Sequence, residues 1–548
     1  MCGIWCYIGN SSDISGMAHT CVTTLLPRGP ESMDVQHLSG AILGFTRLAI
    51  NGLSPAGMQP MHYGNVHWIC NGEIYNWKEL RTRFELNCSS DSDCSVIGPL
   101  WVKFRDRPTE FFRALDGVFS IVIVDGDNII VARDPYGVRP LFRRTVSGGI
   151  AFGSEMKSLI DLPGTNISSY PPGHWSRYSL SGVCEQEVAY HTIPWLKTMS
   201  LSPMYGLEMA CTTILKNLTI AVQKRVLTTE RPIGALLSGG IDSSLIAAMV
   251  QHELRAAGRG PLETFSIGFA GSPDLHYARI VANHIGSKHH EIVVTPADFF
   301  KAIPEVIRAI ESYDITSVRA SVGNWLVCRE ISRRSHAKVI FNGDGADEIF
   351  GSYLYFFRAP DEEAFEAEVS RLLQDIHLYD VLRSDRSISS HGLEARTPFL
   401  DKQFVAVARS IATVWRRPIK VSNEPYMERS TPHLPEPQCE KWILRKAFEH
   451  TGLLPGEVLW RQKEAFSDGV SSGIKSWYQE IQDRVPVGTL STKVYTHLPP
   501  VSAESRYYRD IFDSLYGKSC EQIFSYFWMP KWSGETTDPS ARTLSIYK

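Results

Sequence analysis

The sequence predicts a protein of two domains, an α+β front half rich in strands and an α/β back half built on a parallel sheet. Short β-branched and aromatic segments alternate with turn residues up to about residue 180, whereas strand-like and helix-like segments alternate from about residue 205. The second pattern is typical of a parallel sheet covered by helices. A chain of 548 residues is long enough for two or three domains. We expect domains at residues 2–182 and 205–548, joined by a polar, proline-containing linker at 183–204.

Four apolar segments are the clearest strands of the front half. They mix β-branched and aromatic residues with Gly, Asn and Asp, as strands joined by tight turns do. The stretch "DGDN" at 125–128 separates two apolar runs and predicts a hairpin turn. The segments are "AILGFTRLAI" (41–50), "VHWICNGEIY" (66–75), "FSIVIVDGDNIIVARD" (119–134) and "GGIAFGSE" (148–155).

In the back half, "LLSGGIDSS" (236–244) joins a predicted strand to a predicted helix. In that position backbone N–H groups and the helix dipole favour a phosphate group. The loop lacks the lysine of a Walker loop, which argues against a kinase or a GTPase. A short loop that ends in Asp-Ser suits pyrophosphate, with Asp242 available for Mg²⁺. A Gly-Gly turn alone is usually only a turn, but strand, loop, acid, hydroxyls and helix together are uncommon by chance.

Two further segments of the back half carry charges that suit the same chemistry. "NGDGADE" (342–348) follows another predicted strand, at the carboxyl end where α/β sheets bind ligands. Asp347 could share the metal, and Asp344 could act as a base. "RQKEAFSDGV" (461–470) offers Lys463 to neutralise a pyrophosphate leaving group. The alternatives are that residues 342–348 form a solvated acidic loop and that residues 461–470 form an exposed loop.

The chain begins "MCGIWCYIGN", with a cysteine directly after the initiator methionine. Methionine is normally removed before a small residue, which would make Cys2 the N-terminus. The free α-amine, with an ordinary pKa of roughly 7.7–8.0, can take the thiol proton and activate the nucleophile. Gly3 leaves room for a substrate. The alternative is that Cys2 is a small, buried apolar residue.

Other residues of the front half favour the interpretation of Cys2 as a nucleophile. Arg47 in "RLAIN" (47–51) can hold a carboxylate through two hydrogen bonds. Asn71 and Gly72 in "NGEIYN" (71–76) offer an amide and a backbone N–H as an oxyanion hole. Asp93 in "DSDC" can pair with an ammonium group. A thiol, oxyanion donors, a carboxylate clamp and an ammonium acceptor together describe a site for glutamine.

Composition excludes several classes of protein. The formal net charge of -3 shows no basic bias, so nucleic acid is not an expected partner. The eleven cysteines form no C-x-x-C pair, which favours reduced thiols in the cytoplasm. The first ten residues lack Lys and Arg, and no apolar run is long enough for a membrane span. We expect a cytoplasmic protein without a membrane segment.

From end to end, the chain resembles the glutamine-hydrolysing (class B) asparagine synthetases. The resemblance implies an N-terminal-nucleophile amidotransferase domain, an αββα sandwich, at 2–182. It implies an ATP-pyrophosphatase domain, a parallel α/β domain like the adenine nucleotide α-hydrolases, at 205–548. The matching motifs are "MCGIW", "RLAI", "NGEIYN", "RDPYGVRPLF", "SEMK", "LLSGGIDSS", "GSPDL", "YDITSVRAS", "HGLEARTPFLD", "RQKEAFSDG" and, as in the eukaryotic branch, "MPKW" followed by "DPSARTL".

The resemblance implies a reaction in two linked parts. The Cys2 thiol attacks the glutamine amide and releases ammonia. In the other domain, aspartate attacks the α-phosphate of ATP, giving β-aspartyl-AMP and pyrophosphate. Ammonia crosses inside the protein and displaces AMP to form asparagine. The implied ligands are glutamine, aspartate and ATP with Mg²⁺, without a prosthetic group, and the implied assembly is a homodimer.

The resemblance also assigns roles to residues of this sequence. For catalysis they are Cys2, Asn71, Gly72 and Asp344, and for glutamine Arg47, Leu48, Ala49, Ile50, Asn51, Asn71, Gly72, Glu73 and Asp93. For ATP they are Leu237, Ser238, Gly239, Gly240, Asp242, Ser243, Ile267, Asn342, Gly343 and Lys463, with Asp242 and Asp347 on the metal. Glu394 and Arg396 are expected at aspartate, and Arg139 near the ammonia passage.

Two departures from the family pattern bear on function. The loop usually written Ser-Gly-Glu-Gly is Asn342-Gly343-Asp344-Gly345 here, so its acid is one methylene shorter. The stretch "LLPRGPES" (25–32) replaces His-Arg-Gly-Pro-Asp near the glutamine site. One alternative is an adenylating enzyme with another nitrogen source, as in β-lactam synthetases, but those lack the terminal cysteine. The other is a weakly catalytic paralogue that binds nucleotide or glutamine as a sensor.

Overall fold

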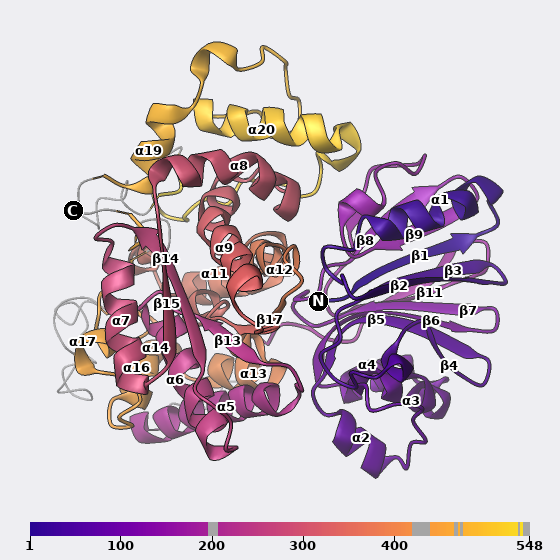
Figure 1. Cartoon of the computed structure of the whole chain (residues 1–548), viewed down its shortest axis with the longest axis horizontal. Helices are drawn as coiled ribbons and strands as arrows, with labels where there is room; N and C mark the ends of the chain where they lie inside the picture. Colours follow the sequence, from indigo (N-terminus) through magenta and orange to yellow (C-terminus); the bar gives the residue numbers. More distant parts are fainter. Residues whose placement is uncertain (195–205, 419–438, 465–468, 472–474, 535–537, 541–548) are drawn as a thin grey trace.

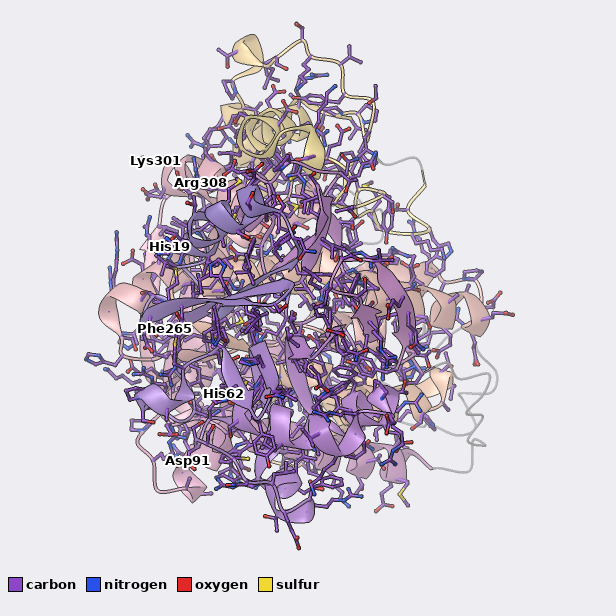
Figure 2. All side chains as sticks on the ribbon, turned by 90° about the vertical axis from the view of Figure 1, so that its right-hand side faces the viewer. His19, His62, Asp91, Phe265, Lys301 and Arg308 are labelled. Carbon is purple, nitrogen blue, oxygen red and sulfur yellow. The ribbon has the colours of Figure 1, made fainter. Side chains whose placement is uncertain are left out.

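The computed structural model describes residues 1–194, 206–418, 439–464, 469–471, 475–534 and 538–540, and these form two domains that lie side by side (Figure 1). In the view of Figure 2 the N-terminal domain faces the viewer, in front of the C-terminal domain. The fold class expected from the sequence is confirmed. Within the described residues, no helix has both the length and the apolar composition needed to cross a bilayer.

The N-terminal domain stacks two antiparallel six-stranded sheets, ordered β10-β8-β9-β1-β3-β2 and β12-β11-β7-β6-β5-β4. Helix α1 covers the first sheet, and α2, α3 and α4 cover the second (Figure 1). The strands are β1 Gly3–Gly9, β2 Ser32–Leu38, β3 Ala41–Arg47, β4 Met61–Tyr63, β5 Val66–Ile74, β6 Gly117–Asp125, β7 Asn128–Arg133, β8 Phe142–Val146, β9 Gly149–Gly153, β10 Ser168–Ser169, β11 His174–Tyr178 and β12 Cys184–Ala189. The helices are α1 Ser12–Thr23, α2 Trp77–Arg83, α3 Ile97–Phe104 and α4 Pro108–Ala114.

Strand β1 shows why this sequence makes a sandwich. Ile4 and Ile8 lie in the apolar layer between the two sheets, whereas Trp5 and Tyr7 pack on the side of α1. Alternate side chains of a strand point to opposite faces, so a strand that is apolar on both faces needs a covering layer on each side. The predicted hairpin is also present, with Asp125 paired to Asn128.

The first domain extends beyond the boundary expected from the sequence. Strand β12 pairs with β11 in the second sheet, although it lies inside the stretch 183–204 predicted as a linker. Its exposed, charged sequence resembles a linker because it lies at the sheet edge, where only one side pairs. Residues 195–204 of the predicted linker lie outside the described residues.

The C-terminal domain is built on the parallel sheet β15-β14-β13-β16-β17. Helices α5, α6 and α7 lie on one face, and α8, α9 and α12 on the other (Figure 1). The strands are β13 Ile233–Leu236, β14 Glu263–Phe269, β15 Lys288–Val294, β16 Val339–Phe341 and β17 Glu394–Arg396. The helices include α5 Leu207–Leu227, α6 Ile241–Ala256, α7 Pro273–Ile285, α8 Pro296–Ile310, α9 Ile315–Arg334, α10 Ala346–Phe350, α11 Glu362–Asp375, α12 Asp380–Ser389, α13 Lys402–Ser410, α14 Thr413–Arg416, α16 Trp442–Phe448, α17 Gly456–Leu459, α19 Trp477–Arg484 and α20 Ala503–Tyr516.

The parallel arrangement brings distant loops together. Because β13, β14 and β16 run in one direction, the loops at 237–240 and 342–345 leave the sheet at the same edge. The order of strands changes direction at β13, since β14 lies on one side of it and β16 on the other. Such a switch point is where open α/β sheets bind ligands.

Candidate active site

The thiol of Cys2 lies directly before β1, partly buried, with its Sγ 3.5 Å from both the backbone N and O of Leu48. Burial raises the pKa of this thiol to about 12, against the opposing influence of the Met1 ammonium. Met1 is itself buried, and its amine donates to the Leu393 carbonyl at 2.8 Å. With Met1 in place, the Cys2 thiol is therefore protonated at neutral pH.

Arg28 fixes the backbone beside the thiol, a role that the sequence did not reveal. Its Nε donates to the Cys2 carbonyl at 2.9 Å. Its Nη1 bonds Glu155 of the same domain and Asp385 of α12, both at 2.8 Å. The side chain is fully buried. The altered stretch at 25–32 thus keeps an arginine that joins the Cys2 backbone to the C-terminal domain. Within this stretch, only the Arg-Gly-Pro core follows the family pattern.

Asn71 and Gly72, the residues predicted to form an oxyanion hole, lie on β5. Asn71 is fully buried, and neither its Oδ1 nor its Nδ2 has a hydrogen-bond partner among the described residues. A Cβ on Gly72 would lie 2.2 Å from the Val118 carbonyl oxygen, so no larger residue fits. Because an unpaired buried amide is costly, the Asn71 side chain is suited to a substrate oxygen.

The loop after β3 is held from inside its own domain and from the neighbouring one. Arg47 donates to the carbonyls of Gly52 at 2.7 Å and Ser54 at 3.0 Å. From the C-terminal domain, Arg231 Nε donates to the Ala49 carbonyl at 2.7 Å, and Glu230 accepts from the Gly52 amide at 2.7 Å. The predicted glutamine loop 47–51 is therefore a contact between domains.

Two carboxylates lie buried beside this loop. Asp93 accepts from the Ile74 amide at 2.7 Å, and burial raises its pKa to about 6. Glu73 accepts from Asn51 Nδ2 at 2.7 Å, and burial followed by repulsion from Asp93 raises its pKa well above the ordinary value. An ammonium group placed next to them would relieve this repulsion, as the predicted glutamine site requires.

A cavity of about 280 Å³ opens at the carboxyl edge of the parallel sheet. Phe265 of β14, labelled in Figure 2, contributes to its wall. The cavity is lined by every residue predicted to bind ATP or the metal except Gly239, and by the predicted base Asp344. These lining residues are Leu237, Ser238, Gly240, Asp242, Ser243, Ile267, Asn342, Gly343, Asp344, Asp347 and Lys463. Residues 465–468 of the motif around Lys463 lie outside the described residues.

The loop between β13 and α6 has the shape of an anion site. Gly239 adopts φ +74°, and a Cβ there would lie 2.4 Å from Tyr277 Cβ. The hydroxyls of Ser238 and Ser243 lie 3.0 Å apart. Gly240 begins α6 without a side-chain cap, which leaves the first helical N–H groups to bind a ligand.

The carboxylates of Asp242 and Asp347 lie in this cavity, and both contact the ammonium group of one lysine side chain. The Lys441 ammonium contacts both, at 2.5 Å from Asp347 Oδ1. Lys463 Nζ lies 2.6 Å from both oxygens of Asp347. Burial alone would raise the pKa of Asp347, but Lys441 and Lys463 outweigh it and hold that pKa far below the ordinary value. No sequence pattern distinguished Lys441 from other lysines.

Asp344, the shortened acid, lies in the same cavity beside Arg383. Burial raises its pKa, and the Arg383 guanidinium, with Nη2 3.7 Å from Asp344 Oδ1, opposes that rise. Arg383 is held by Asp380, one turn earlier on α12, at 2.7 Å. The sequence did not single out the Asp380–Arg383 pair, although its i,i+3 spacing on a helix is a usable signal.

Glu394 and Arg396 lie between the two sites and are not among the residues that line the cavity. Arg396 bonds Glu394 at 2.7 Å and Glu73 of the other domain at 3.2 Å. Arg139 is fully buried here, with Nη2 3.4 Å from the Ala395 carbonyl and 3.8 Å from Glu394. The expected roles of these three residues at aspartate and at the ammonia passage stay predictions.

Strand β17 connects the two sites physically. The Leu393 carbonyl, just before the strand, accepts from the Met1 amine. At its other end, the Arg396 carbonyl accepts from the Asn342 amide at 3.1 Å, where the acidic loop begins. Three residues of backbone therefore separate the surroundings of the thiol from the wall of the cavity.

Comparison with known proteins agrees with the two-domain organisation. The glutamine amidotransferase domain family matches residues 1–199, and the asparagine synthase family matches residues 213–367 and 359–535. Glutamine-hydrolysing asparagine synthetases from Cricetulus griseus and Gallus gallus are each 39% identical to this chain, and that from Homo sapiens is 38% identical. Each alignment covers 100% of this chain and 99% of the relative. The chain belongs to the family of glutamine-hydrolysing asparagine synthetases.

Proposed function

We propose that this chain converts aspartate to asparagine, taking nitrogen from glutamine and cleaving ATP to AMP and pyrophosphate through β-aspartyl-AMP. The observation that carries the proposal is the pairing of two sites in one chain. At one end of β17 the Met1 amine, next to Cys2, bonds the Leu393 carbonyl, and the same domain holds the buried amide of Asn71, which has no partner among the described residues. At the other end lies a cavity with an anion loop, two carboxylates and two lysines. A function that used only one of these sites would leave the presence of the other unexplained.

At the first site, Cys2 is the nucleophile once Met1 has been removed. The new α-amine takes the thiol proton, and the sulfur attacks the side-chain carbonyl carbon of glutamine. Asn71 Nδ2 and the Gly72 N–H stabilise the oxyanion that forms. Asp93 and Glu73 pair with the α-ammonium of glutamine, and the loop held by Arg47 positions its carboxylate. Ammonia leaves, and water hydrolyses the thioester.

At the second site, the loop at 238–243 and the N-terminus of α6 bind the phosphates of ATP. The donor set suits Mg²⁺ because Asp242 Oδ1 is buried without a partner among the described residues, and the carboxylates of Asp242 and Asp347 both contact the Lys441 ammonium. Bound there, Mg²⁺ would neutralise phosphate charge. Lys463 pairs with the departing pyrophosphate. Arg383 is placed to bind a carboxylate of aspartate, since it lines the cavity and Arg396 does not.

The remaining assignments complete the proposal. Ammonia passes from Cys2 along β17, beside Arg139 and Glu394, to the cavity, where Asp344 accepts a proton from the attacking nitrogen. The enzyme works in the cytoplasm as a homodimer on glutamine, aspartate and ATP. It needs Mg²⁺ but no prosthetic group, membrane or nucleic acid.

The decisive experiment measures products from aspartate and Mg-ATP, supplied with either glutamine or ammonium. We expect asparagine, AMP and pyrophosphate from both nitrogen sources, and Cys2→Ala should lose only the glutamine reaction. Mass spectrometry of the intact protein should show that Met1 is absent. Asparagine from neither source, with glutamate still released from glutamine, would contradict the synthetase proposal and favour a sensor.

A further inference from the structure

Lys441 has an unusual position in the nucleotide cavity. Its side chain is 1% exposed, and its ammonium lies between the carboxylates of Asp242 and Asp347. Lys463, by contrast, pairs with Asp347 and with no other carboxylate of the described residues. Among the described residues, Asp242 therefore has one cationic partner, and its second oxygen, Oδ1, has no partner.

The backbone at Lys441 is strained and firmly held. Its φ of +55° is in the left-handed region, which is unfavourable for a residue with a side chain. The Lys441 carbonyl accepts from the Arg445 amide at 3.0 Å, and Arg445 Nε donates to the Glu440 carbonyl at 2.9 Å. Strained residues persist where their surroundings fix them, and here that conformation directs the amine into the cavity.

We propose that Lys441 is a positioning residue that holds the place of the metal ion in the nucleotide-free enzyme. Its ammonium neutralises the repulsion between Asp242 and Asp347 and keeps both carboxylates in place. A divalent cation arriving alone would have to displace this ammonium. Mg²⁺ arriving with ATP does not meet this obstacle, because the phosphates give Lys441 a new partner. The inference rests on the proposed function, specifically on Asp242 and Asp347 as metal ligands.

The consequence is that the protein binds a free divalent cation weakly until nucleotide is present. Two cations cannot occupy the same space between the carboxylates, and like charges at such a short distance repel strongly. Removal of the ammonium should therefore create a metal site in the enzyme without nucleotide. A residue with only a structural role would not produce this gain of binding.

The test titrates the full-length protein with Mn²⁺ alone and follows free Mn²⁺ by electron paramagnetic resonance. Lys441→Met should bind one Mn²⁺ roughly tenfold or more tightly than the unaltered protein does. Lys441→Arg, which keeps a cation, should not. Lys446→Met is the matched control, because Lys446 lies on α16, the short helix that begins directly after Lys441, but its side chain is 27% exposed and pairs with Glu449. Lys441→Gln serves the same comparison if Lys441→Met does not fold.

The outcomes separate the two proposals. Unchanged Mn²⁺ affinity in the folded Lys441→Met or Lys441→Gln variant would overturn the place-holding role. If a new Mn²⁺ site appears, addition of Asp242→Asn should remove it. Persistence of the site in that double variant would refute Asp242 as a metal ligand, and with it the metal site of the proposed function.

Discussion

In the proposed glutamine site, most of the chemistry is assigned to single polar residues. These residues are already buried in the structure without substrate. Asn71 is the clearest case, because its amide lacks a partner among the described residues. Asn71→Ala should lower the rate of glutamine hydrolysis by about 10²–10³-fold, as the loss of an oxyanion donor does. Ammonium-dependent synthesis should be unchanged. Asn128→Ala, in the exposed hairpin, is the control, and equal rates in both variants would exclude the oxyanion role.

Asp344 tests whether the shortened acid still serves the synthetase reaction. Asp344→Asn keeps the shape of the residue but removes the base, so ammonium-dependent synthesis should fall at least about tenfold while ATP binding persists. Asp344→Glu should retain synthesis, since it adds one methylene toward the cavity. Steady-state assays with ammonium measure the synthesis rate, and calorimetry measures ATP binding. Full synthesis by Asp344→Asn would remove this residue from the mechanism.

At the scale of elements, the proposed phosphate site depends on the turn from β13 into α6. Gly239→Ala places a Cβ against Tyr277 in a residue with positive φ, so the loop must move away from its phosphate-binding shape. ATP affinity should fall at least about tenfold. Gly258→Ala is a matched control, because Gly258 has φ +65° but no atom within 4 Å of the added carbon. Equal ATP affinity in the two variants would show that the loop shape is irrelevant.

At the scale of the whole molecule, each domain holds part of the other's site. Arg231 belongs to the C-terminal domain but bonds the glutamine loop at Ala49 and also Glu31, at 2.5 Å. Arg231→Ala should raise KM for glutamine about tenfold, the effect of losing one or two charged hydrogen bonds. Ammonium-dependent kinetics should not change. The exposed Arg279, paired with Glu291 inside the C-terminal domain, provides the control variant Arg279→Ala.

The buried ion pairs that Glu155 makes with Arg28 and Lys157 of its own domain also predict acid sensitivity. Burial would raise the pKa of Glu155, but Lys157 and Arg28 outweigh it and hold this pKa at about 2, below the ordinary 4.5. Because the folded-state pKa is the lower one, this stabilisation is complete above about pH 4.5 and is lost as the pH falls toward 2. It amounts to about 3 kcal/mol.

Glu155→Gln should therefore lower the free energy of unfolding at pH 7 and have progressively less effect below pH 4. Urea unfolding at several pH values measures the difference. Glu110→Gln is the control, since Glu110 and its partner Arg107 are both more than half exposed. A destabilisation by Glu155→Gln that does not depend on pH would argue that packing, and not charge, is what the substitution removes.

The sequence by itself determined the two-domain architecture and most of the chemistry. The β-branched and aromatic segments that form β3, β5, β6, β7 and β9, and the strand–loop–helix pattern around β13, are local features and are readable without a structure. Cys2, Asn71, Asp242, Asp347 and Lys463 were recognisable because each lies in a short motif whose residue types suit one reaction. The linker was placed too early, because the edge strand β12 is as polar as a linker.

Only the tertiary structure decided which residues surround those motifs. Arg28, Arg231, Arg383 and Lys441 act across long separations in sequence, and a charged residue far from any motif gives no local sign of its partner. The parallel sheet brought Arg383 and Lys441 to their partners by placing the loops after β13 and β16 at one edge, whereas Arg28 and Arg231 act across the contact between the domains. Burial then fixed the charges, since a guanidinium or ammonium inside the protein is stable only beside a carboxylate.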